Sequence, residues 1–205
     1  MNLRSGGDHM NRIYYLTGKS SSGKDLILRR LLEKSEFSPI ILYTTRPMRE
    51  NEKNGREYQF VDRGDFCKMR SRGLVLEYRT YNTTQGEWTY FTAVGSVDLS
   101  KGNCLGIGTL ESYAALKKHF GELIVPLYIE VEDGLRLARA LKRERREASP
   151  KYAEMCRRFL ADCQDFSEEK LLDAGITRRF SNNGEPEECL EEILRYISGI
   201  QGDDE

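Results

Sequence analysis

The sequence has few of the residues that build metal centres or disulfide frameworks. Its 205 residues include two histidines and five cysteines, and no two cysteines have the C-x-x-C spacing. An odd number of cysteines without that spacing supports neither a zinc site nor a disulfide framework, and favours buried or unreactive thiols. The five are Cys67, Cys104, Cys156, Cys163 and Cys189.

Excess charge and long apolar runs are also missing. The 32 Lys and Arg residues nearly balance the 33 Asp and Glu residues, which leaves a formal charge of −1. Nothing in this balance predicts a nucleic acid or a membrane surface as a partner. No apolar run reaches membrane-spanning length and no secretory signal is recognisable, so we expect a cytoplasmic protein. A hydrophobic content of 39% is enough for one substantial core in a single domain.

The clearest motif is a glycine-rich loop with the pattern G-x-x-x-x-G-K, which ends at Lys24. A β-branched and aromatic run at 13–17 precedes it and leucines at helical spacing follow it, which predicts a strand, a loop and a helix. Backbone N–H groups of such a loop surround phosphate oxygens, while the lysine and the helix N-terminus add positive charge. We expect a nucleoside triphosphate to contact Gly18, Lys19, Ser20, Ser21, Ser22, Gly23, Lys24 and Asp25.

Asp25 departs from this motif. The residue after the lysine is usually Ser or Thr, whose hydroxyl coordinates Mg²⁺. A carboxylate about 4 Å from a phosphate would be repelled by roughly 4 kcal/mol at an effective dielectric constant near 20, unless a cation lies between the two charges. Asp25 is therefore either a direct or water-mediated ligand of Mg²⁺, or a residue at the helix N-terminus that points away from the site.

The rest of the chain alternates strand and helix patterns, which is typical of an α/β fold. Apolar or alternating runs predict strands at 39–43, 55–61, 74–79, 88–92, 103–108, 123–131 and 177–183. Helical spacing predicts helices at 63–72, 110–119, 133–147 and 186–197, with a further helix after the break at 148–150. The segment 81–86 is expected to be a polar turn within a small inserted β unit.

Arginines cluster in two places. Arg46 and Arg49 follow the predicted strand at 39–43, and ligands in open α/β sheets lie beyond the carboxyl ends of strands. Two guanidinium groups at this spacing could share one phosphate. The second group, on the predicted helices after residue 133, consists of Arg139, Arg143, Arg146, Arg157 and Arg158. Both groups could equally be solvated surface charges, but opposite a phosphate-binding loop the helical arginines would belong to a mobile lid.

Together these motifs resemble the guanylate kinases, a family of P-loop nucleoside monophosphate kinases. The resemblance runs from Met10 to about Ser198. It rests on the glycine-rich loop, T-T-R-x-x-R at 44–49, G-x-x-Y-x-F-V at 55–61, the strand at Glu77, and Y-x-T at 90–92. It implies a three-layer P-loop fold with a central parallel sheet, a small mixed or antiparallel β subdomain for the monophosphate, and a helical lid. It also implies ATP as the phosphoryl donor and Mg²⁺ as the cofactor.

The resemblance also implies roles for single residues. Those that match the family's monophosphate ligands are Arg46, Arg49, Tyr58 and Tyr90, and those that match its guanine contacts are Glu77 and Thr92. The catalytic set matches Lys24, Arg139, Arg143 and Arg158. The asparagine beside the adenine of ATP matches Asn182.

The chemistry of Glu77 agrees with guanine recognition. A carboxylate accepts hydrogen bonds from N1–H and the 2-amino group of guanine, whereas adenine has no proton on N1, and such a site can discriminate by roughly 10⁴ or more. An ordinary solvent-facing strand residue is the alternative. The sequence departs from the family where Gly106 and Gly108 replace an Asp-x-Asp pair and where Leu42 replaces a frequent serine. The hairpin at 82–87 and the lid are also a few residues longer than in the family.

We therefore expect one guanylate-kinase-like domain at 10–198, with its core at 10–43 and 102–198, the monophosphate-binding insertion at about 44–101 and the lid at about 139–160. Residues 1–9 are expected to be a disordered leader or cloning remnant, and 199–205 a frayed tail. The expected partners are nucleotides, and the chain is expected to be a monomer or a homodimer. Three activities stay open: phosphoryl transfer to GMP or dGMP, transfer to another nucleoside monophosphate, and binding without catalysis.

Overall fold

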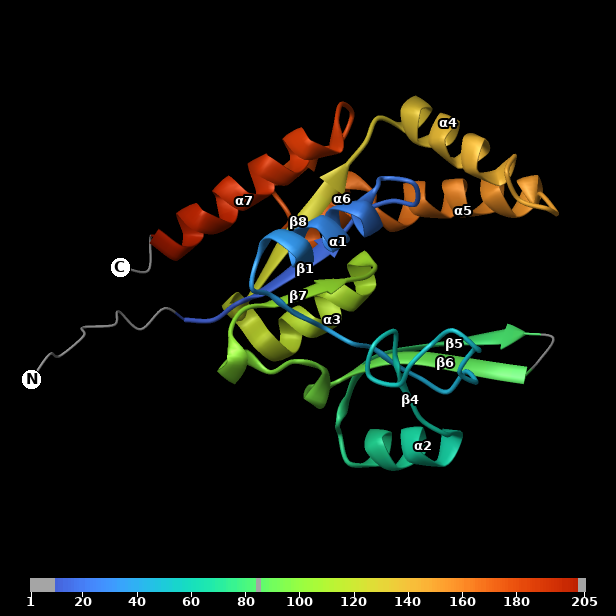
Figure 1. The fold of residues 1–205 in the computed structure, drawn as a ribbon, viewed down its shortest axis with the longest axis vertical. Coiled ribbons are helices and arrows are strands. Elements are labelled where there is room, and N and C mark those ends of the chain that lie inside the picture. The colour runs from blue at the N-terminus through green and yellow to red at the C-terminus, as the bar shows by residue number, and fades with distance from the viewer. Residues whose placement is uncertain (1–9, 84–85, 203–205) are drawn as a thin grey trace, which may run out of the picture.

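A computed structural model describes residues 10–83 and 86–202, so the expected leader and the last three residues lie outside the described part. The core is a parallel five-stranded sheet in the order β2-β7-β1-β8-β9 (Figure 1). Its strands are β1 (Ile13–Thr17), β2 (Ser38–Pro39), β7 (Cys104–Ile107), β8 (Ile124–Glu130) and β9 (Arg179–Ser181). All five cysteines carry free thiols, and no helix of the described part is long and apolar enough to cross a bilayer.

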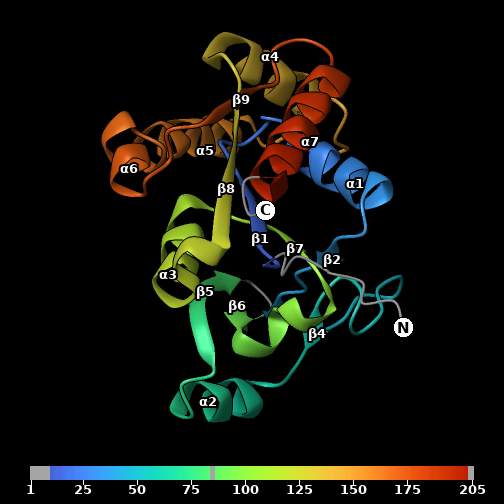
Figure 2. The same cartoon turned by 90° about the vertical axis from the view of Figure 1, so that its left-hand side faces the viewer.

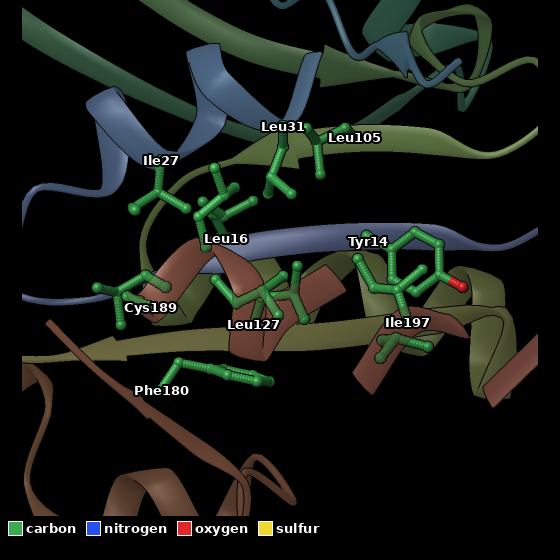
Figure 3. Close-up of a cluster of buried hydrophobic side chains, with 13 residues drawn as sticks. Tyr14, Leu16, Ile27, Leu31, Leu105, Leu127, Phe180, Cys189 and Ile197 are labelled. Carbon is green, nitrogen blue, oxygen red and sulfur yellow. The ribbon is translucent and has the colours of Figure 1, made fainter. Parts of the chain in front are cut away.

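Helices cover both faces of this sheet, as Figure 2 shows from the side. Alternation along β1 explains the arrangement, because successive strand side chains point to opposite faces. Tyr14 and Leu16 pack against α1 (Lys24–Lys34) and α7 (Pro186–Gly202), in the cluster drawn in Figure 3. Ile13 and Tyr15 pack in a second cluster with α3 (Leu110–Phe120) and α6 (Glu168–Asp173). The predicted three-layer α/β fold with a central parallel sheet is confirmed.

A second, smaller sheet of mixed direction stands apart from the core, with strand order β4-β3-β6-β5. Its strands are β3 (Tyr43–Thr44), β4 (Gln59–Phe60), β5 (Val75–Thr83) and β6 (Gly86–Ala93). Helix α2 (Arg63–Ser71) packs on it through Phe66, which contacts Phe91 in a small core of its own. The predicted small β subdomain is therefore present.

Two helices lie side by side at the opposite end of the molecule. They are α4 (Asp133–Glu144) and α5 (Tyr152–Asp165), and they project from the same side of the core as the small sheet (Figure 1). Short 3-10 helices at Val94–Ser96, Leu99–Lys101 and Gly121–Leu123 connect the larger elements. The α4–α5 pair corresponds to the expected helical lid.

Several predicted elements have different bounds. The single strand expected at 39–43 is two short strands in different sheets, because the chain crosses from the core to the small sheet within it. The strand expected at 55–61 is reduced to Gln59–Phe60. The turn expected at 81–86 is shorter, because β5 continues to Thr83 and β6 begins at Gly86, and its residues 84–85 lie outside the described part. Helix α4 ends at Glu144, α6 was not predicted, and α7 runs on to Gly202, through part of the expected tail. Amphipathic patterns locate elements well but do not fix their ends.

Candidate active site

The glycine-rich loop depends on backbone conformations that L-residues rarely adopt. Gly18 has φ 152° and Gly23 has φ 86°, and Ser21 between them has φ 65°. A Cβ on Gly18 would lie 2.6 Å from the Ile129 carbonyl oxygen, where no atom fits. Glycine is therefore required at position 18 both for its backbone angles and for close contact with β8.

Asn182 fixes this loop from behind. Its Nδ2 donates to the Ser22 carbonyl oxygen at 2.7 Å, and its side chain is 2% exposed. A Cβ on Gly23 would lie 2.5 Å from the same Nδ2. The expected contact of Asn182 with an adenine is therefore not matched by its position, because the amide is directed at the loop and buried. The next residue, Asn183, is exposed and its Oδ1 accepts from the Glu132 N–H at 2.8 Å.

Lys24 lies where loop and lid meet. Burial lowers its pKa, and the positive charges of Arg158 and Arg143 add to that effect, while Asp25 and Asp162 oppose it. Arg143 and Arg158 also line a 170 Å³ pocket with Ser20 and Ser21 of the loop. An Arg158 Nη2 to Ser20 Oγ distance of 3.5 Å brings the guanidinium to the loop. The structure thus brings together three of the four residues expected to be catalytic.

Arg139 is the exception. It does not line this pocket, and its side chain makes no hydrogen bond or ion pair with any residue of the described part. The inward face of α4 is instead formed by Arg136, Ala140 and Arg143, which all line the pocket. The predicted set, Arg139, Arg143 and Arg146, has the same i, i+4, i+7 spacing but begins three residues later, so the predicted face is rotated by about 60° around the helix axis. Spacing could not separate the two sets, because both follow the helical period and both include Arg143.

Arg136 and Asp162 form a buried ionic cluster that the sequence analysis missed. Arg136 is 1% exposed, its Nη1 lies 3.2 Å from Asp162 Oδ2, and its guanidinium stacks 3.9 Å from the centre of the Phe159 ring. Its Nη2 also donates to Asp133 Oδ1 at 2.9 Å. Asp162 Oδ2 in turn accepts from the Ser20 N–H at 2.8 Å. Both lid helices are therefore attached to the phosphate-binding loop by charge-assisted bonds.

Asp25 is exposed in the first turn of α1, directly after Lys24. The nearby ends of β1 and β7 carry no carboxylate, since Gly106 and Gly108 replace the acids of the family. The reason is steric: a Cβ on Gly108 would lie 2.0 Å from the Tyr15 hydroxyl oxygen, and one on Gly106 would lie 2.8 Å from the Tyr15 ring. Tyr15 thus fills the space that larger side chains at 106 and 108 would need.

Arg46 and Glu52 form the centre of the expected monophosphate site. Arg46 is 4% exposed and holds Glu52 with two bonds, Nη1 to Oε2 at 2.9 Å and Nη2 to Oε1 at 2.7 Å. The Arg49 N–H also donates to Glu52 Oε2, at 2.8 Å. The Arg46 guanidinium holds the pKa of Glu52 down to about 2. The sequence analysis did not identify Glu52 as a partner of Arg46, although Arg46, Arg49 and Glu52 follow one another at intervals of three residues.

The two tyrosines expected in this site lie beside Arg46. The rings of Tyr58 and Tyr90 meet edge to face with centroids 5.6 Å apart. The Arg46 guanidinium lies 5.5 Å from the Tyr58 ring, and its pKa is raised mainly by the hydrogen bond with Glu52, with a smaller contribution from Tyr90. Burial raises the pKa of Tyr58, so its hydroxyl stays neutral beside the cationic Arg46 at neutral pH. Hydroxyls and guanidinium groups so arranged can bind a phosphate.

Glu77 and Thr92 are directly opposite each other on β5 and β6. The Thr92 hydroxyl donates to Glu77 Oε1 at 2.7 Å, which orients the carboxylate. Glu77 lines a 480 Å³ pocket between the small sheet and the core. The pocket is lined by Tyr15, Leu42, Glu77, Arg79, Tyr81, Thr83, Trp88, Tyr90, Ile107, Gly108 and Ser112. An apolar pocket with a few polar groups is the usual form of a small-molecule site.

The two halves are joined by a larger cleft of 720 Å³. Ser20 of the loop and Arg158 and Asp162 of the lid line one side, and Arg79 and Tyr81 of the small sheet line the other. Arg79 and Tyr81 also line the pocket of Glu77 and Tyr90, so the cleft leads from the phosphate-binding loop to that pocket.

Known proteins share this sequence and this fold. The family model described as guanylate kinase matches residues 10–170. A guanylate kinase of Nitrosomonas europaea is 41% identical over 69 residues, which cover 33% of this chain and 34% of that protein. One from Legionella pneumophila is 31% identical over 93 residues, which cover 44% of this chain and 42% of that protein. The matched stretches thus span only about a third to two fifths of these relatives.

A solved structure agrees over a longer part of the chain. The crystal structure of a guanylate kinase from Anaplasma phagocytophilum has a TM-score of 0.64 with 18% identity, and the match covers 95% of this chain and 88% of that one. At this identity the likeness concerns the fold alone. Because the family model extends over residues 10–170, from before the phosphate-binding loop into the lid, the chain belongs to the guanylate kinase family.

Proposed function

We propose that this protein transfers the γ-phosphoryl group of ATP to GMP or dGMP, which gives ADP and the guanosine diphosphate. One observation supports this proposal most strongly. The 720 Å³ cleft shares Ser20 and Arg158 with the loop–lid pocket and Arg79 and Tyr81 with the pocket that Glu77 lines, so it connects the two. The guanylate kinases similar to this chain act as the precedent for that pairing of sites.

The residues present suit the chemistry of this reaction. Phosphoryl transfer needs positioned substrates and charge neutralisation more than covalent help from the protein. Lys24 and the lid arginines supply positive charge on the donor side. Arg46, Tyr58 and Tyr90 would hold the acceptor phosphate, which is already anionic and needs no general base. Arg49 would complete this group, since its backbone is bound to the same Glu52 carboxylate.

Mg²⁺ would be bound mainly by the phosphates in this protein. No cluster of three or more potential metal-binding side chains occurs within the described residues. Mg²⁺ commonly keeps several waters and uses only one or two carboxylates together with substrate phosphates. Asp25, exposed at the start of α1, is the carboxylate that fits this arrangement. With the ion bound, its charge would be shared between Asp25 and the phosphate oxygens instead of repelling them.

Tyr15 over Gly106 and Gly108 favours one alternative, a kinase for a different nucleoside monophosphate. The acids missing at 106 and 108 would otherwise contribute to the base site, and their place is taken by a phenol. Glu77 nevertheless supports guanine over adenine, because a carboxylate has no donor for the unprotonated N1 of adenine.

A coupled assay of ADP release with GMP, dGMP, AMP, CMP and UMP tests the proposal. We expect Mg²⁺-dependent turnover with GMP and dGMP, and at most weak turnover with the other three. A preference for AMP, CMP or UMP would instead identify a kinase of different specificity. If none of the five is turned over but GMP still binds, the protein is a binding domain without catalysis.

The same assay tests Asp25 as a metal ligand. The Mg²⁺ concentration for half-maximal rate should rise in Asp25→Ala and change less in Asp25→Ser, whose hydroxyl can also coordinate the ion. Equal Mg²⁺ dependence in all three proteins would show that Asp25 points away from the metal.

A further inference from the structure

The acceptor pocket contains a second charged residue that no motif predicted. Of the described residues that line the 480 Å³ pocket, only Glu77 and Arg79 carry charge. The others are aromatic, aliphatic, glycine or hydroxyl residues. The pocket therefore presents one strong acceptor and one strong donor to whatever it binds.

Arg79 is held beside Glu77 by the strand and by α3. Two residues apart on β5, both side chains leave the same face of the small sheet. Arg79 Nη2 donates to the Ser112 hydroxyl and lies 3.5 Å from Glu77 Oε2. The exposed fractions of the two side chains are 29% and 12%, respectively. The guanidinium is therefore positioned without being buried.

Only one nitrogen of the guanidinium is engaged in these contacts. Neither Nε nor Nη1 of Arg79 makes a hydrogen bond to any residue in 10–83 or 86–202. Glu77 Oε1 is engaged by Thr92, while Oε2 has only the long contact to Arg79. A bidentate contact from arginine uses Nη2 together with Nη1 or Nε, so Arg79 would exchange the long 3.5 Å contact of Nη2 with Glu77 for a ligand while an unengaged nitrogen supplies the second donor.

This pair complements one edge of guanine. Going around the base, the 2-amino group and N1–H are donors, and O6 and N7 are acceptors. A carboxylate pairs with the first two, and arginine pairs in bidentate fashion with O6 and N7 in protein–DNA contacts. Adenine presents an acceptor at N1 and a donor at the 6-amino group, so it would oppose both charged residues with the wrong partner.

Among the described residues that line the pocket, Arg79 alone offers a planar fork of donors, because the hydroxyl residues and Trp88 carry one donor each. Leu42 is apolar, Gly108 has no side chain, and Tyr15 is almost fully buried under the pocket. We propose that Arg79 binds O6 and N7 of the acceptor guanine and so completes the base recognition begun by Glu77. This inference rests on the proposed function, because it takes GMP as the acceptor.

The test compares GMP with 7-deaza-GMP, which lacks the N7 acceptor and keeps the rest of the base edge. Dissociation constants are measured by calorimetry for the wild type and for Arg79→Leu, Arg79→Lys and Arg72→Leu. Arg72 is an exposed arginine of the same subdomain and serves as the matched control. Thermal unfolding of each variant checks that it is folded.

We expect the wild type and Arg72→Leu to bind GMP about tenfold more tightly than 7-deaza-GMP, since a hydrogen bond to a charged donor is lost. Arg79→Leu should weaken GMP binding by a similar factor and bind both ligands equally. Arg79→Lys should keep part of the preference, because a lysine has donors but no planar fork.

Two results would overturn the inference. Equal binding of both ligands by the wild type would show that N7 is not recognised, and this comparison needs no variant. If Arg79→Leu weakens the binding of GMP and of 7-deaza-GMP by the same factor, Arg79 only supports Glu77 and α3. In either case turnover of GMP by the wild type would leave the proposed function standing, whereas failure to bind GMP at all would overturn both.

Discussion

The cleft has a half proposed to bind the phosphoryl donor and a half proposed to bind the acceptor, and this donor half and acceptor half are built in different ways. The donor half uses backbone N–H groups of a loop whose shape is set by Gly18 and Gly23. The acceptor half uses side chains on a small sheet with its own aromatic core around Phe91. A loop of backbone groups tolerates little change in sequence, whereas a side-chain site can change one contact at a time. Acceptor specificity can therefore change while the fold and the phosphate-binding loop persist.

The two halves also differ in how charge is handled. On the donor side the buried Arg136 pairs with the partly buried Asp162, which ties the lid to Ser20, and with the exposed Asp133. On the acceptor side the Glu77–Arg79 pair is partly exposed and held at 3.5 Å. A buried pair chiefly fixes structure, because breaking it leaves an uncompensated charge. A loose pair in a pocket can exchange its partner for a ligand.

Loss of Lys24 should have the largest effect. Lys24→Met is expected to lower kcat with ATP and GMP by about 10²- to 10³-fold, because a charge that stabilises the transition state is removed. Steady-state kinetics measure this, with Lys34→Met, in the last turn of the same helix, as the control. If Lys24→Met retains most of its kcat, the donor half does not take part in the reaction as proposed.

The buried cluster should be the next most sensitive feature. Arg136→Met is expected to lower the free energy of unfolding by about 3 kcal/mol, because Asp162 and Asp133 lose their counter-charge. Urea denaturation measures this, and Arg139→Met, three residues further along α4, is the matched control. If both variants lose the same stability, the distinction between the inward and outward registers of α4 is wrong.

Glu77 should control the choice of base. Glu77→Gln is expected to lower kcat/KM for GMP by about 30-fold with little change for AMP, because an amide cannot accept from both N1–H and the 2-amino group. The exposed Glu33→Gln serves as a control. A parallel loss for GMP and AMP would indicate that Glu77 supports the pocket and does not recognise the base.

The smallest expected effect is on the free energy of unfolding at acid pH, through Glu52 of the acceptor half. Glu52 has a pKa of about 2 in the folded protein against about 4.3 for an unperturbed glutamate. A depressed folded-state pKa stabilises the fold above the unfolded value and loses that contribution as pH falls through the folded value. Glu52→Gln should therefore flatten the pH dependence of unfolding between about pH 4.5 and 2, without altering its shape near neutrality. An unchanged acid slope would contradict the ion pair with Arg46.

Much of this arrangement could be predicted from the sequence. The phosphate-binding loop was identifiable because its backbone geometry demands glycine at set positions. Spacing matched to a known family predicted Arg46, Arg49, Tyr58, Glu77 and Thr92 as site residues, and their roles stay predictions. The two halves of the cleft and the parallel core followed from the same patterns.

Other features depend on contacts that spacing does not encode. The inward register of α4 is decided by the stacking of Arg136 on Phe159, and both arginine registers fit the helical period. The glycines at 106 and 108 are explained by the ring of Tyr15, a residue about ninety positions earlier that reads as an ordinary strand residue. Asn182 matches in sequence a residue that lies beside the adenine of ATP in the family, but in this fold its amide is directed at the Ser22 carbonyl oxygen.

The central claim is that both halves serve one reaction between two nucleotides. A bisubstrate compound that joins adenosine and guanosine through five phosphates would occupy both at once. Calorimetry should show one molecule bound per chain, at least about tenfold more tightly than either ATP or GMP alone, because the second contact becomes intramolecular. The diadenosine analogue should bind less tightly, because Glu77 cannot pair with adenine. Binding no tighter than ATP alone would contradict the account.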